Sequence, residues 1–135
     1  MNDQEYEETK QRVFAIARKW QRALGLTWWV IRYEWLRERI PTSEEDRAHG
    51  FVVVAQAYAH WKYGEAEIRV SLPAIKDQTD AEIERIMIHE FMHVLVDECR
   101  QTGDGWLDHE ERVVTNLTRA ILWVRDAMQV HDTDY

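Results

Sequence analysis

An amphipathic helix is predicted for the first part of the chain, from Asp3 to Leu24. Its apolar residues recur at steps of three and four, which places them along one face of a helix. They are Val13, Phe14, Ile16, Ala17, Trp20 and Leu24. Gly25 follows directly, and glycine commonly ends a helix because it adopts a left-handed backbone without strain. This segment is therefore predicted to pack one face on a core.

Three strands are predicted in the middle of the chain. Residues Thr27–Trp35 are dense in aromatic and β-branched side chains, which favour strands. Phe51–Trp61 and Glu65–Leu72 flank Lys62-Tyr63-Gly64, which has the length and glycine of a hairpin turn. Apolar and polar residues alternate in the last of these strands, so we expect one of its faces to be buried and the other to be in water.

The segment between the first two strands, residues 37–50, is polar and shows no hydrophobic period. It also contains Pro41, which disfavours regular structure. We expect a surface loop or a mobile flap here.

A buried helix is predicted to begin at Thr79 or Asp80 and to end near Arg100. Glu82 stands three residues after Thr79, which is the spacing of a capping box. The helix is apolar almost all the way round, which is typical of a helix inside a protein. Its apolar residues are Ile83, Ile86, Met87, Ile88, Phe91, Met92, Val94, Leu95 and Val96.

A turn over residues 101–105 is predicted to lead into a last helix, from about Leu107 to Val130. Its inward face is predicted to carry Val113, Val114, Leu117, Ile121 and Val124. The whole chain, residues 1–135, is thus expected to be a single α+β domain with an N-terminal helix, a three-stranded, mostly antiparallel sheet and two further helices.

Composition narrows the classes of function. The chain has 17 Lys and Arg against 25 Asp and Glu, a net charge of -8, so no nucleic-acid partner is expected. No apolar run approaches the roughly 18 residues of a membrane span, and the N-terminus has no basic, apolar leader. Cys99 is the single cysteine, so no intrachain disulfide is possible. We expect a cytoplasmic protein without a membrane partner; the sequence does not define its oligomeric state.

The buried helix contains the one motif that indicates chemistry, the HExxH pattern from His89 to His93. Two histidines four residues apart lie on the same helical face, so both imidazoles can reach one Zn²⁺ ion. Glu90 lies about 100° round the helix from His89, where it can contact a water in the metal's open position. Burying these three polar side chains without partners would cost several kcal/mol, and a metal removes most of that cost.

A catalytic zinc needs a third protein ligand, and the last helix offers three candidates. Steps of 100° per residue put Glu110 about 30° from the centre of the predicted inward face. His109 lies about 70° and Glu111 about 125° from that centre. We therefore predict Glu110 as the third ligand, with Glu111 and His109 as alternatives because helix boundaries read from sequence shift by a few residues.

His89, Glu90 and His93, followed by a glutamate at the start of the next helix, resemble the zincin metallopeptidases whose third ligand is glutamate, the gluzincins. Sixteen residues lie between His93 and Glu110, a spacing similar to that of such a helix pair. The order of helix, strands, motif helix and ligand helix is similar to that of small zincin-like proteins of bacteria and phages.

The resemblance implies a hydrolase that cleaves peptide bonds. His89, His93 and Glu110 would bind Zn²⁺, and Glu90 would deprotonate the zinc-bound water that attacks the substrate carbonyl. Tyr58, His60, Tyr63 and His131 are candidates for stabilising the resulting oxyanion.

The resemblance also implies that an extended peptide or protein substrate would add to a sheet edge, for which the strand with residues 66–70 is the candidate.

The alternative to a peptidase is a non-catalytic zinc-binding accessory or regulatory protein of a phage or prophage. The presence of Glu90 disfavours it, because a purely structural site needs no base.

Overall fold

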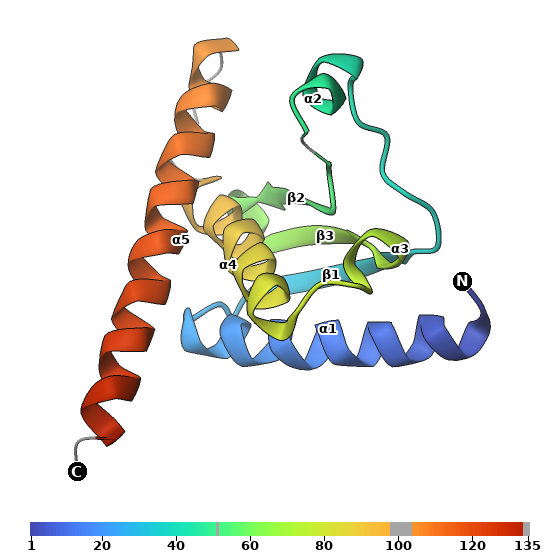
Figure 1. The fold of residues 1–135 in the computed structure, drawn as a ribbon. Coiled ribbons are helices and arrows are strands. Elements are labelled where there is room, and N and C mark those ends of the chain that lie inside the picture. The colour runs from blue at the N-terminus through green and yellow to red at the C-terminus, as the bar shows by residue number, and fades with distance from the viewer. Residues whose placement is uncertain (51, 98–103, 134–135) are drawn as a thin grey trace.

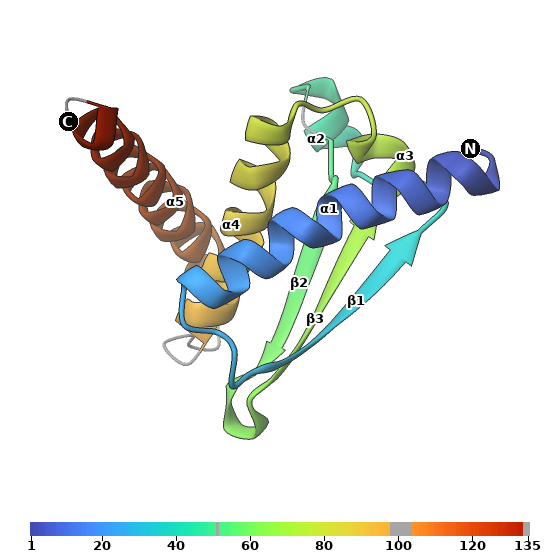
Figure 2. The same ribbon diagram turned by 90° about the horizontal axis from the view of Figure 1, so that it is seen from below.

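A computed structural model describes residues 1–50, 52–97 and 104–133 of the chain, which form an α+β domain (Figure 1). A three-stranded sheet carries α1 and α4 on one face, and α5 packs against α4 (Figure 2). The elements are α1 (Asp3–Ala23), β1 (Val30–Leu36), α2 (Glu44–Ala48), β2 (Ala55–His60), a 3-10 turn (Trp61–Tyr63), β3 (Glu65–Ser71), α3 (Leu72–Ile75), α4 (Asp80–Val96) and α5 (Asp104–Thr133). The expected α+β class is confirmed.

The sheet is mixed, with strand order β1-β3-β2. β3 runs antiparallel to β2, with Ala55 opposite Val70, and parallel to β1, with Val30 opposite Glu65. The prediction of a mostly antiparallel sheet is therefore wrong for one of the two strand pairs. The reason is the long connection between β1 and β2, which allows β2 to pair on the far side of β3 instead of forming a hairpin with β1.

The two faces of β3 differ as its alternating sequence predicts. Ala66, Ile68 and Val70 are buried under the helices. On the other face Arg69 forms ion pairs with Glu34 of β1 and Glu67, at 3.1 and 3.0 Å. One face of the sheet is therefore in the core and the other carries charge.

The segment predicted as an irregular loop contains a short helix, α2. The Ser43 hydroxyl accepts a hydrogen bond from the Asp46 amide at 3.1 Å, which caps it. None of the α2 residues is buried, so it lacks the apolar period by which helices are found in a sequence. β2 begins at Ala55 and not at Phe51, which lies outside the described residues.

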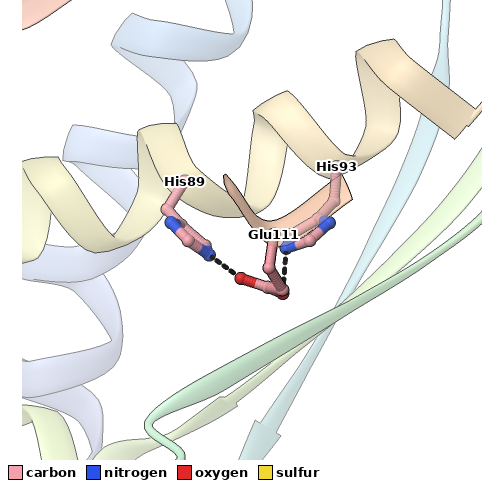
Figure 3. Close-up of side chains that lie close together, drawn as sticks. All are labelled: His89, His93 and Glu111. Atoms are coloured by element: carbon pink, nitrogen blue, oxygen red, sulfur yellow. Dashed lines mark ion pairs between the residues drawn. The ribbon is translucent and has the colours of Figure 1, made fainter. Parts of the chain in front are cut away.

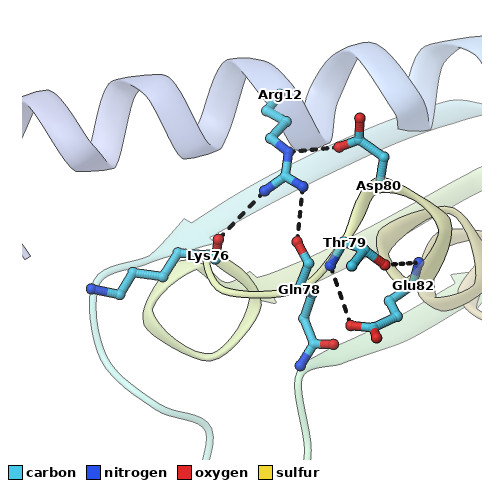
Figure 4. A network of polar contacts seen from close by, with 6 residues as sticks. All are labelled: Arg12, Lys76, Gln78, Thr79, Asp80 and Glu82. Atoms are coloured by element: carbon cyan, nitrogen blue, oxygen red, sulfur yellow. Dashed lines mark hydrogen bonds and ion pairs between the residues drawn. The ribbon is translucent and has the colours of Figure 1, made fainter.

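The start of α4 is fixed by two sets of hydrogen bonds (Figure 4). Thr79 and Glu82 form the predicted capping box, each side chain accepting from the other's backbone amide at 3.2 Å. Arg12 of α1 donates to the carboxylate of Asp80 at 2.7 Å and to the Gln78 carbonyl at 2.8 Å. These contacts tie α1 to the helix that carries the histidines.

The middle of α4 is the centre of the core. Ile83, Met87, Ile88 and Phe91 are completely buried, and the helix packs against α1, β2 and α5. The predicted burial of this helix is confirmed. Its predicted extension to Arg100 falls partly on residues 98–103, which lie outside the described ranges, as does Cys99.

α5 is longer than predicted and is turned differently about its axis. It begins at Asp104 instead of Leu107 and packs on α4 through the buried side chains of Val114 and Thr118. Leu117 and Val124, predicted to face inward, are 39% and 51% exposed. Arg125 forms an ion pair with Glu84 of α4, close to the start of that helix. The last turns of α5 project beyond α1 (Figures 1 and 2).

None of the helices in the described ranges is long and apolar enough to cross a membrane.

Candidate metal centre

His89 and His93 lie one turn apart on α4, with ring centroids 5.0 Å apart. The apolar side chains of the same helix occupy the faces that pack on α1 and the sheet, so the two imidazoles are left on the side of α5. Both rings are mostly buried. The HExxH spacing thus brings together the two histidines that it predicts.

Glu111 of α5 places its carboxylate between the two rings (Figure 3). His89 Nε2 lies 3.2 Å from one carboxylate oxygen of Glu111, and His93 Nε2 lies 2.8 Å from the other. One ligand atom from each of these three residues can be chosen so that all lie within 4.8 Å of one another.

Glu110, the predicted third ligand, lies on the other side of the His93 ring. Its carboxylate oxygen accepts a hydrogen bond from His93 Nδ1 at 2.8 Å, and the side chain is only 3% exposed. The group of possible ligands contains Glu111 instead. The angular position of Glu110 on the helix correctly predicted that its side chain points inward. In that direction it reaches Nδ1 of His93, whereas both Nε2 atoms face the more exposed side chain of Glu111.

The contacts within this cluster shift the pKa values of His93 and Glu111. Burial would lower the pKa of His93, but its hydrogen bonds to Glu111 and Glu110 outweigh that effect and raise the pKa to about 9. The hydrogen bonds from His89 and His93 hold the pKa of the Glu111 carboxyl well below its usual range. In the metal-free protein, Glu111 is therefore an ionised carboxylate facing a protonated His93.

Glu90, the predicted base, is buried beside the cluster. Burial raises the pKa of its carboxyl to about 7, although the neighbouring His93 and His89 act in the opposite direction. A carboxyl group with a pKa near neutrality both accepts and returns a proton easily at physiological pH.

The donor set of His89, His93 and Glu111 could hold a metal ion. Two imidazole nitrogens and one carboxylate oxygen form a common protein ligand set for catalytic zinc. Ligand atoms at about 2.0–2.1 Å from a tetrahedral ion lie roughly 3.3 Å apart, close to the 3.2 and 2.8 Å between the Glu111 oxygens and the two Nε2 atoms.

None of the other candidate residues whose side chains the structure describes belongs to this group of possible ligands. His109 is exposed at the surface of α5, where its Nδ1 lies 3.4 Å from Arg112. Tyr58 stacks under Arg69 on the charged face of the sheet, and its hydroxyl donates to Gln56 at 3.1 Å. His60 and Tyr63 line a small cavity at the 3-10 turn. His131 has a side chain outside the described residues.

The strand predicted to bind substrate at a sheet edge is not an edge. Residues 66–70 belong to β3, which pairs on both sides. The edge strand that contacts α4 is β2. At its end the Trp61 amide donates to Asp97, one turn beyond His93, at 3.4 Å. The alternation of apolar and polar residues predicted strands here, but it carries no information on their order in the sheet.

Sequence reasoning missed the contact between Glu110 and His93 Nδ1. The available signal was the pair of adjacent glutamates at the start of the ligand helix, because metal-binding histidines commonly donate their second ring N–H to a carboxylate.

No protein-family model matches this chain, and neither a curated protein nor a solved structure matches it.

Proposed function

We propose that this chain is a zinc-dependent peptidase of the zincin type, with His89, His93 and Glu111 as metal ligands. The observation that carries the proposal is the convergence of these three side chains from α4 and α5 beside the buried carboxyl of Glu90. Three ligands leave a coordination position open, which is the property that separates catalytic from structural zinc sites.

Bound zinc would supply a Lewis acid that polarises the substrate carbonyl and lowers the pKa of water. Glu90 is the general base in this proposal, since it accepts a proton from the attacking water. It then returns the proton to the leaving amine nitrogen. Its raised pKa suits both steps, and the positive charge of a metal ion would favour its ionised form.

Glu110 positions His93 in this scheme. By accepting the hydrogen bond from Nδ1, it keeps the proton on that nitrogen, so that Nε2, which faces Glu111, is the nitrogen left to bind the metal.

An extended peptide is the proposed substrate, paired along the outer edge of β2. β2 is an edge strand, its partner strand β3 lies on one side only, and it packs against the histidine helix. Main-chain hydrogen bonds to an edge strand bind a peptide largely independently of its sequence.

The first test is the metal content per chain of four proteins: wild type, His93→Ala, Glu111→Gln and Glu90→Gln. We expect about one zinc in the wild type and in Glu90→Gln, and much less in the two ligand variants. Folding of each variant is checked by circular dichroism. No metal in folded wild type that was never exposed to chelator would contradict the proposal.

Activity is measured separately, by mass spectrometry of a peptide library incubated with zinc-loaded wild type and zinc-loaded Glu90→Gln. Cleavage by the wild type that the Glu90→Gln variant lacks supports a peptidase. A full complement of zinc with no cleavage would support the alternative, a zinc-binding regulatory protein.

A further inference from the structure

An apolar groove lies between the C-terminal end of α1 and the middle of α5, and it shares no residue with the metal centre. Its volume is about 490 Å³. Trp20 and Leu24 of α1 form one wall, and Leu117, Val124 and Met128 of α5 form the other. Figure 2 shows α5 leaving the domain beside the end of α1. Val124 and Met128 are more than half exposed, so the groove is open to solvent.

The α5 wall has the spacing of a helix that pairs with another helix. Leu117, Ile121, Val124 and Met128 follow one another at steps of four, three and four residues, which aligns them along one face. A groove with such a wall accepts the apolar residues of an amphipathic helix at positions i, i+3 or i+4, and i+7.

The charges around the groove identify the kind of helix that fits. Residues 18–23 of α1, around Trp20, contain three basic side chains, Arg18, Lys19 and Arg22, and no acidic one. Residues 117–128 of α5 contain Arg119, Arg125 and Asp126, and Arg125 is paired with Glu84 and Asp126. The two walls thus carry five basic residues and one acidic residue in a chain with net charge -8. Arg18, Lys19 and Arg22 form no ion pair with a carboxylate in the described ranges. A second copy would bring two basic helix pairs together, whereas an acidic helix would be attracted.

We propose that this groove binds an amphipathic helix of a partner protein, with an apolar stripe that enters the groove and Asp or Glu residues on its flanks. The proposal is independent of the metal centre and of peptidase activity.

The test uses two synthetic helical peptides of about 18 residues, each with the same leucine stripe. One carries Glu at all flanking positions and the other carries Lys. Binding to the full-length protein is measured by fluorescence anisotropy of the labelled peptides. We expect the Glu peptide to bind at least about tenfold more tightly than the Lys peptide, by an amount that decreases with added salt.

Variants locate the binding. Val124→Glu should weaken binding of the Glu peptide at least about tenfold, because it places a carboxylate in the groove. The matched control is Val52→Glu, since Val52 is 59% exposed and outside the groove, and this variant should bind normally. If Val124→Glu does not fold, the exposed pair Lys19→Glu with Arg22→Glu should weaken binding by charge alone.

Four results would overturn the proposal. The first is no binding of either peptide, and the second is equal binding of both. The third is a wild-type dimer in sedimentation equilibrium that Val124→Glu dissociates, which would assign the groove to a second copy. The fourth is binding of the protein to phosphatidylglycerol vesicles that Val124→Glu abolishes, with no peptide binding, which would assign it to a membrane surface.

Discussion

At the scale of single residues, Glu110 and Glu111 make different contacts although they are neighbours in sequence. Glu111 faces both Nε2 atoms, and Glu110 accepts from the opposite nitrogen of His93. We expect Glu111→Gln to lose metal, and Glu110→Gln to keep about one zinc per chain with an affinity about 10- to 100-fold lower. Competition with a chromophoric chelator measures both affinities. Equal losses in the two variants would contradict this division of roles.

The rescue variant for that experiment is Glu110→Asp. It retains a carboxylate that can accept from Nδ1, although it is one methylene shorter. A merely space-filling role would make Gln the better substitute because it preserves the shape of Glu110. A positioning role predicts that Asp retains more affinity than Gln.

The protonation of His93 predicts how metal binding depends on pH. The pKa of His93 is raised to about 9, and a metal ion at Nε2 must displace the proton there. Binding at pH 7 should therefore release about one proton from this residue, and the apparent zinc affinity should rise with pH until about pH 9. Calorimetry in buffers of different ionisation enthalpy counts the protons. A pH-independent affinity between pH 6 and pH 8 would refute the assignment.

The same raised pKa has the opposite effect on the metal-free fold. His93 binds its proton more tightly in the folded state, so this interaction stabilises the fold fully below about pH 6.5, the unfolded pKa. The contribution is lost as pH rises through about 9. Zinc binding and metal-free stability should therefore respond to pH in opposite directions over this range.

At the scale of elements, the capping box at the start of α4 should matter for stability and not for the metal. Thr79 accepts a hydrogen bond from the Glu82 amide, ten residues before His89. Thr79→Ala should lower the free energy of unfolding by about 1 kcal/mol. The melting temperature should fall by about 3–5 °C for a domain of this size.

Thr27→Ala is the matched control for that measurement, because Thr27 is exposed and lies outside every helix and strand. Thermal unfolding followed by circular dichroism compares the two variants. Similar melting temperatures for both would show that the capping box contributes little, and loss of zinc in Thr79→Ala would show that the start of α4 is coupled to the metal centre.

The elements also show which parts of the structure are visible in sequence. Helices α1 and α4 and strand β3 were predictable. The apolar residues of α1 and β3 recur with the period of a helix and of a strand, and α4 is apolar almost all the way round. α2 was not predictable, since none of its residues is buried and no period forms. The parallel pairing of β1 with β3 is decided by the path of the connection between β1 and β2, and local alternation contains no such information.

The candidate site was predictable to the same extent. His89, Glu90 and His93 are fixed by spacing within one helix, so their mutual placement needs no knowledge of the fold. The choice between Glu110 and Glu111 depends on how α5 is rotated and displaced against α4. The packing of Val114 and Thr118 on α4 fixes part of that placement, and the apolar but exposed Leu117 and Val124 made the sequence misleading.

At the scale of the whole molecule, the proposed metal ties α4 to α5. The proposed ligands come from both helices, which also meet through the buried Val114 and Thr118, the hydrogen bond of His93 with Glu110 and the ion pair of Glu84 with Arg125. Zinc at 100 times its dissociation constant should stabilise the fold by about 2.7 kcal/mol, provided that the unfolded chain does not bind it. Chemical unfolding with and without zinc measures the difference, and His93→Ala should show none.

The parallel pairing of β1 with β3 also has a consequence for how the chain reaches its fold. β2 and β3 are joined by a short turn, so their pairing closes a small loop. The pairing of Val30 in β1 with Glu65 in β3 closes a much longer loop, which contains α2 and β2. Closing a long loop costs more chain entropy than closing a short one, and distant pairings slow folding. We therefore expect the hairpin of β2 and β3 to form early and the docking of β1 to limit the rate of folding.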